Sequence, residues 1–192
     1  MNEEKKLVFK LEKIKTDPKR KRRAKAHAVV GAATAAGVAI AAIPLPYPDA
    51  ALLAPTEALE INALANLYGI GKGDSSTRLI NTILDAGAVT LAGKTAISAL
   101  KAVPGINIGA TVLNAIVAGS IIAALGEGSM LIFESISKGE RSAEDIDWVH
   151  RILESRLTGK VVNSSVQAVK NIGSETDPKK IAKIILDSFL KK

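Results

Sequence analysis

The sequence predicts an all-α fold in which two apolar helical hairpins form the core, with amphipathic helices at both ends. Hydrophobic residues make up 47% of the 192 residues, whereas aromatic residues contribute only 3%. The apolar content is mainly Ala, Ile, Leu and Val, and small aliphatic side chains on closely packed surfaces favour helices over sheets. Proline and glycine clusters interrupt the apolar stretches at the places where helices would end. A chain of this length, with a mean hydropathy of +0.21, can bury one substantial core.

The charge distribution divides the chain into three parts. Residues 1–27 hold eleven Lys or Arg against four Asp or Glu, residues 28–137 hold four against seven, and residues 138–192 hold eleven against eight. We therefore expect a basic amphipathic N-terminal arm, an apolar double-hairpin helical core and amphipathic C-terminal helices over these ranges. The long polar arm that precedes the apolar part argues against a cleaved signal peptide.

The first hairpin follows a short amphipathic helix expected at residues 5–15. Asp17 and Pro18 predict the start of a helix that runs through a basic stretch and ends near Ile43. The turn that ends this helix contains three prolines and an acidic residue that can cap the next helix: Pro44, Pro46, Pro48 and Asp49.

The next helix is expected from residue 50 to residue 68, with a flexible glycine-rich loop, residues 69–73, after it. Its apolar residues are Leu52, Leu53, Leu59, Ile61, Leu64 and Leu67, and its polar residues are Glu57, Glu60 and Asn62. We expect the two glutamates to lie on a solvated face, where carboxylates cost least.

The second hairpin would begin with a helix from about Thr77 to Ala102, capped by Asp74 or Ser75. A turn at Pro104 and Gly105 leads into the most apolar stretch of the chain, residues 106–126, which continues as a helix to about residue 136. A shift of the sequence by 60 residues aligns the two hairpins and their proline turns, which predicts an internal structural repeat. The helices expected after it span Ser142 to Leu157, 161–172 and 177–190, with a break at Thr158 and Gly159.

No catalytic or cofactor site is predicted. The chain lacks cysteine, which excludes disulfides and thiolate metal sites and fits a reducing compartment, and its two histidines are far apart. Residues 88–95, AVTLAGKT, match a phosphate loop only loosely, because the first glycine and the preceding strand are missing. The remaining acids of the core, Asp85 and Glu127, have no predicted histidine or metal partner beside them. We expect a protein that is not an enzyme and that needs no cofactor or metal.

The basic run at residues 19–25 is the candidate for lipid or anion binding, through Lys19, Arg20, Lys21, Arg22, Arg23 and Lys25. A polybasic run beside an apolar helix is typical of the cytoplasmic side of a membrane, although a plain solvated helix face remains an alternative. Nucleic acid is a less favoured partner, since stacking aromatics and a recognition fold are missing. The apolar runs at 28–43 and 106–126 fit an embedded hairpin and a soluble bundle about equally well.

Two segments carry a family resemblance: IPLPYPDAALLAPTEALEINALANLYGIGKG and KAVPGINIGATVLNAIVAGSIIAALGEGSMLIF. They resemble the GTPase-associated bacterial domain of unknown function found in YcjF-type proteins. The matching positions are Pro44, Pro46, Asp49, Tyr68, Gly69, Pro104, Gly105, Gly126 and Glu127. The resemblance implies membrane association and a GTPase nearby. Because this chain shows no GTPase domain and no true phosphate loop, the implied GTPase would be a separate protein.

These observations favour a non-enzymatic, cytoplasmic, membrane-associated helical module that anchors or docks a partner. A soluble all-helical interaction or homo-oligomerisation protein is the alternative. A membrane-perturbing, pore-forming protein that hides an apolar hairpin until insertion is a third possibility.

Overall fold

The computed structural model describes residues 18–43, 50–88, 96, 99–100 and 108–190. All regular secondary structure in this part of the chain is helical, which confirms the predicted all-α class. The elements are α2 (Pro18–Ala41), α3 (Ala50–Tyr68), α4 (Asp74–Ala88), α6 (Ala110–Ser137), α7 (Ile146–Ser155), the π-helical turn η1 (Arg156–Lys160), α8 (Val161–Ile172) and α9 (Pro178–Leu190).

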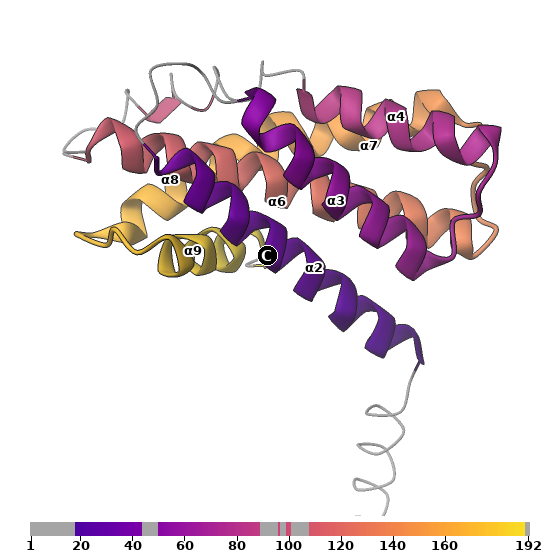
Figure 1. The fold of residues 1–192 in the computed structure, drawn as a ribbon, viewed down its shortest axis with the longest axis horizontal. Coiled ribbons are helices and arrows are strands. Elements are labelled where there is room, and N and C mark those ends of the chain that lie inside the picture. The colour runs from indigo at the N-terminus through magenta and orange to yellow at the C-terminus, as the bar shows by residue number, and fades with distance from the viewer. Residues whose placement is uncertain (1–17, 44–49, 89–95, 97–98, 101–107, 191–192) are drawn as a thin grey trace, which may run out of the picture.

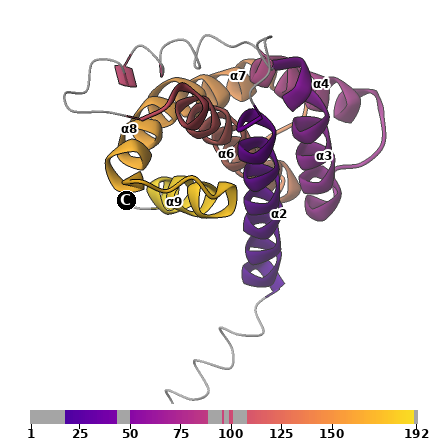
Figure 2. The same ribbon diagram turned by 60° about the vertical axis from the view of Figure 1, so that its left-hand side comes forward.

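Helix α6 is the centre of the bundle, and most other elements pack on it (Figure 1). Helices α2 and α3 lie side by side across α6, and α9 contacts both α2 and α6 (Figure 2). Helix α4 lies between α3 and α7, and α8 packs against α6 and α9. The first turns of α2 extend past the bundle (Figure 1).

The sequence of α6 explains its central position. Its side chains are almost all apolar or small, so every face of the helix can be covered by a neighbour. Close approach of α2 depends on Gly37, because a Cβ there would collide with the side chain of Ile122 on α6. The result is a core of aliphatic residues with Phe133 as its largest fully buried side chain.

The helix boundaries of the first half agree closely with the local signals. Helix α2 starts at Pro18 and ends two residues before Ile43, and α3 ends at Tyr68 because Gly69 adopts a positive φ of 71°. Helix α4 starts earlier than expected, at Asp74. The helix expected at 5–15, the phosphate-loop-like segment at 88–95 and the turn residues Pro44, Pro46, Pro48, Asp49, Pro104 and Gly105 lie wholly or largely outside the described residues. The internal repeat therefore stays a prediction.

The C-terminal third departs from expectation at two places. The helix expected from Ser142 begins only at Ile146, because the side chain of Asp145 accepts the backbone N–H of Trp148 and caps the helix there. The predicted break at Thr158 and Gly159 is wrong: both residues lie in η1, one wide helical turn that joins α7 to α8. A glycine inside a helix costs only about 1 kcal/mol, and the buried side chains of Leu157 and Val161 hold this turn against the bundle. The predicted start of the last helix is confirmed, since Asp177 accepts the backbone N–H groups of Lys179 at 2.8 Å and Lys180 at 3.2 Å.

Candidate functional site

The N-terminal half of α2 presents the basic run to solvent. Five of the six candidate cations have exposed side chains: Lys19, Arg20, Lys21, Arg23 and Lys25. They point to several sides of the helix because this end of α2 extends past the bundle (Figure 1). No acidic residue accompanies them on α2. This half of the helix is therefore a concentrated, exposed positive charge.

The sixth cation, Arg22, connects α2 to the rest of the protein. Its guanidinium lies over the ring of Tyr68 at 4.8 Å from the centroid, and it donates a hydrogen bond of 3.4 Å to Ser137 Oγ. These contacts join the start of α2 to the ends of α3 and α6. An open pocket of about 620 Å³ beside them is lined by Pro18, Lys19, Arg22, Ser137, Lys138 and Glu140. The sequence could not distinguish Arg22 from the other cations of the basic run, because a cation–π contact between residues far apart in the chain has no signature in the local sequence.

The C-terminal half of α2 has one buried and one exposed side. We use the name outer face of α2 for the exposed apolar residues of this half and of the turn just after it: Ala28, Ala32, Ala36, Ala39 and Ile43, which lies two residues beyond the helix end. Ile43 is 54% exposed. Lys21 and Lys25 precede Ala28 at helical spacing, so they continue the same stripe. Charged and apolar surface thus follow one another along one side of one helix.

Two helices are long and apolar enough to cross a membrane by length and composition, but they are placed very differently. Of the most apolar window, 83% is buried inside the bundle for α6 and 33% for α2. The core helix of a soluble protein passes the same test. In this structure α6 is the buried central helix of the bundle, and α2 is a surface helix.

Helix α3 buries two acidic residues that were expected to face solvent. Glu57 and Glu60 are buried, at 5% and 2% exposure, whereas the apolar Leu59 is 74% exposed. The prediction of a solvated face for both glutamates is therefore wrong. Because α3 is apolar almost all round, the fit of Ile61 and Leu64 against their neighbours decides which side is buried.

The carboxyl group of Glu60 is buried without a hydrogen-bond partner at either oxygen. It lies against Gly126 of α6, where an added Cβ would overlap Glu60 Oε1. Burial raises the pKa of Glu60 well above its usual value, and the nearby charges of Glu57 and Glu127 raise it further. Burial also raises the pKa of Glu57. A buried ionised carboxylate with no partner is far costlier than a neutral one, so this arrangement favours a protonated Glu60.

Glu127, the residue after Gly126, has a partner that Glu60 lacks. Its Oε1 lies 2.9 Å from His27 Nδ1 on α2, and both side chains are partly exposed. Burial and the charge of Arg156 lower the pKa of Lys160 on η1, while the charge of Glu127 opposes that shift. Among the described residues no group of three His, Asp or Glu side chains is arranged to hold a metal ion. The chemistry available at this place is the holding and release of a proton.

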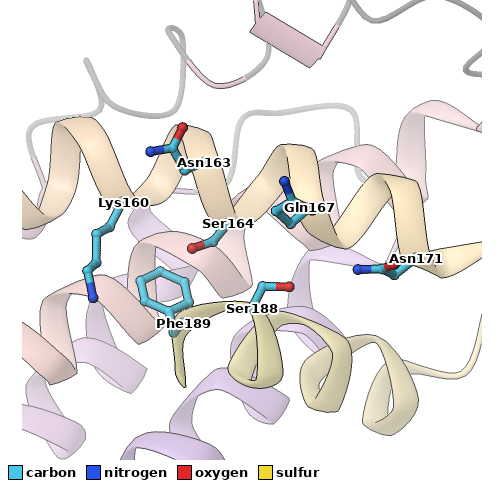
Figure 3. A pocket seen from close by; sticks show the side chains of 7 residues that line it. All are labelled: Lys160, Asn163, Ser164, Gln167, Asn171, Ser188 and Phe189. Atoms are coloured by element: carbon cyan, nitrogen blue, oxygen red, sulfur yellow. The ribbon is translucent and has the colours of Figure 1, made fainter. Parts of the chain in front are cut away.

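A polar pocket of about 490 Å³ lies between α8 and α9 (Figure 3). Asn163, Gln167 and Asn171 follow one another along α8, and Ser188 and Phe189 come from α9. Lys160 and Ser164 complete the lining. The spacing of polar residues by four along α8 is the sequence signal that could have revealed it. Its amides, hydroxyls and single amine form no nucleophile–base pair, so we assign it no reaction.

The fold and these sites together define a helical-bundle domain with a basic and apolar surface helix and a buried carboxyl pair. The family described as a domain of unknown function, DUF697, matches residues 8–155. The chain belongs to this family, which confirms the resemblance to the GTPase-associated domain of YcjF-type proteins. No curated protein and no solved structure matches the chain significantly. The family match ends with α7, so η1, α8 and α9 pack on the bundle from outside the matched region.

Proposed function

We propose that this protein is a non-enzymatic helical module that docks on an anionic bilayer surface through α2 and holds a partner protein there. The single observation that carries the proposal is the stripe along α2, in which the exposed Lys21 and Lys25 lead directly into the outer face. A helix with this order of charge and apolar surface suits the interface between lipid headgroups and acyl chains.

Electrostatic attraction would supply most of the binding. Each Lys or Arg near an anionic membrane contributes about 1 kcal/mol to the free energy of binding. The contribution of the five exposed cations together is therefore larger than the contribution that the alanine side chains of the outer face make by burial. Ile43 is the one large apolar side chain of the outer face. Attachment of this kind is shallow and depends on salt.

The burial of α6 argues for docking on the surface over insertion of a hairpin. To enter lipid, α6 would have to leave nearly all of its protein contacts, whereas α2 needs no rearrangement to expose its stripe. The anionic leaflet of a cell membrane is the cytoplasmic one, which supports a cytoplasmic location. The family resemblance supports a separate GTPase as the partner.

Sedimentation with vesicles tests the docking surface. Wild-type protein is mixed with phosphatidylcholine vesicles with and without phosphatidylserine, at low and high salt. The test variant replaces Lys19, Arg20, Lys21, Arg23 and Lys25 by Gln and keeps Arg22, which contacts Tyr68. The matched control replaces five exposed cations outside α2: Lys72, Arg78, Arg151, Lys170 and Lys183.

We expect the wild type and the control to bind only the anionic vesicles and to be released by high salt, and the test variant to stay in solution. Equal loss of binding in both variants would contradict a site on α2. Protein that resists both high salt and carbonate would indicate an inserted hairpin. A wild type that never sediments, and whose mass in solution rises with concentration, would favour the alternative of a soluble oligomerisation module.

A further inference from the structure

The side of α2 and α3 that faces away from α6 carries no exposed carboxylate among the described residues. Helix α2 contains no acidic residue, and the acidic residues of α3 are Glu57 and Glu60, which are both buried. Because α2 and α3 pack side by side on α6, their outward residues share one side of the molecule (Figure 2). Leu59 and the outer face of α2 thus lie on a side with no exposed negative charge from either helix.

Burial of Glu60 depends on its protonation. The charged and titratable groups around it are Glu57 on α3, Glu127 on α6 and His27 on α2, and His27 pairs with Glu127. Lys160 and Arg156 on η1 interact with each other and, through Lys160, with Glu127. An ionised Glu60 would therefore face two carboxyl groups with no cation bonded to it. Its ionisation is incompatible with the position it occupies.

A limited movement of α3 would bring Glu60 to water. Successive residues on a helix are about 100° apart, so the 74% exposed Leu59 lies one residue position around α3 from the buried Glu60. The loop after α3 offers little resistance. Gly69, Gly71 and Gly73 have open space around them, and Gly69 already has a positive φ.

We propose that α3 makes membrane docking depend on protonation, an inference that rests on the proposed function. We call the side of α2 and α3 that faces away from α6 the docking side. When Glu60 is neutral and buried, neither helix adds an exposed negative charge to the docking side. When Glu60 ionises, α3 shifts, and a carboxylate reaches the side that faces anionic lipid and repels it. The negative surface potential of such a bilayer concentrates protons, so the membrane that attracts the basic run also favours the docking form.

The test compares three proteins on phosphatidylserine vesicles from about pH 5 to about pH 9, a range that spans the usual and raised pKa values of carboxyl groups. The test variant is Glu60→Gln, which keeps the shape of the side chain and cannot ionise. The matched control is Glu154→Gln, which removes an exposed carboxylate on α7. Fluorescence of Trp148, the one tryptophan, verifies that each protein is folded at each pH.

We expect wild-type binding to fall as pH rises, by about tenfold per pH unit once Glu60 ionises in the free protein. Glu154→Gln should follow the wild type, and Glu60→Gln should bind equally well at high and low pH. In solution, hydrogen-exchange protection of α3 should decrease at high pH in the wild type and remain in Glu60→Gln.

The contrary outcomes separate the two proposals. Binding that does not change with pH, or that changes equally in the wild type and Glu60→Gln, would overturn the role of Glu60 and leave docking through α2 intact. Absence of binding by both proteins at every pH would overturn the docking function and this inference with it.

A cysteine at position 59 reports which side of α3 meets the lipid. Since the chain has no cysteine, Leu59→Cys carries the only thiol and can be labelled with an environment-sensitive fluorophore. We expect the label to enter an apolar environment with anionic vesicles at low pH and to leave it at high pH, except in the Glu60→Gln background. A label that stays in water under all conditions in which the protein is bound would contradict the placement of α3 in the docking side.

Discussion

The carboxyl group of Glu60 lies against the backbone of Gly126, at a point on α6 where a side chain would occupy the same space. The two residues come from different helices and are far apart in the sequence, yet the position of each depends on the size of the other. Gly126 makes room for a carboxyl group in the core, and Glu60 fills a space that would otherwise be empty. Three of the following predictions concern α3 and this contact.

Glu60→Gln should stabilise the protein, and the gain should depend on pH. Because the pKa of Glu60 is raised in the folded state, its contribution to stability is complete below the unfolded value of about 4.5 and is lost as pH rises toward the raised value. The gain from Gln should thus be small at pH 4 and grow by about 1.4 kcal/mol per pH unit in that interval. Urea unfolding followed by Trp148 fluorescence measures it. A constant difference across pH would contradict a buried titrating carboxyl.

Gly126→Ala should destabilise the bundle. The added methyl group would overlap Glu60 Oε1 and approach Val30 Cγ2 at 2.8 Å, and overpacking of this kind costs about 1–3 kcal/mol. The loss should be smaller in a Glu60→Ala background, since part of the overlap is then removed. Gly31→Ala is the matched control, because its methyl group would meet Leu186 at an ordinary 3.5 Å and an alanine favours helix. Thermal unfolding of five proteins measures these differences: the wild type, Gly126→Ala, Glu60→Ala, the double variant and Gly31→Ala.

Truncation of Leu64 should lower the free energy of unfolding much more than truncation of Leu59, although both are leucines of α3. Leu64 is fully buried, so Leu64→Ala should cost about 2–5 kcal/mol, whereas Leu59→Ser should change the unfolding free energy by less than about 0.5 kcal/mol. Leu59→Ser should instead weaken binding to anionic vesicles. Greater destabilisation by Leu59→Ser than by Leu64→Ala in urea unfolding would show that α3 has the opposite side inward in solution.

Arg22→Gln should loosen the start of α2 more than Lys25→Gln does. The guanidinium of Arg22 over the Tyr68 ring is worth about 0.5–1 kcal/mol, and Lys25 is an exposed neighbour on the same helix. A double-mutant cycle with Tyr68→Leu isolates the contact. A coupling energy near zero in chemical unfolding would assign Arg22 to the lipid-binding cations alone.

The parts of the fold that could be predicted have local signals. Gly69 and Asp177 fix helix ends through their own backbone or side-chain chemistry, and the structure places helix ends at both. The apolar composition of α6 predicted a helix over this stretch, but it did not decide between a buried core helix and a membrane span. These features depend on a few neighbouring residues, so one sequence is enough to find them.

The parts that could not be predicted depend on contacts between distant residues. The inward side of α3 is set by its fit against α6, and a helix that is apolar almost all round offers no periodicity to reveal it. The buried positions of Glu57 and Glu60 follow from that fit. The continuous turn at Thr158 and Gly159 depends in the same way on the packing of η1 against its neighbours, which outweighs the local preference for a break.

The packing of α2 fixes how the protein would sit on a surface. This helix contacts α3, α6 and α9, and Arg22 connects its basic end to Tyr68 and Ser137. A bilayer that binds α2 therefore sets the orientation of the whole bundle, as a flexible tether would not. Helix α8 lies across α6 from the docking side (Figure 2). A partner bound at α8 would be held at one height and one angle above the lipid.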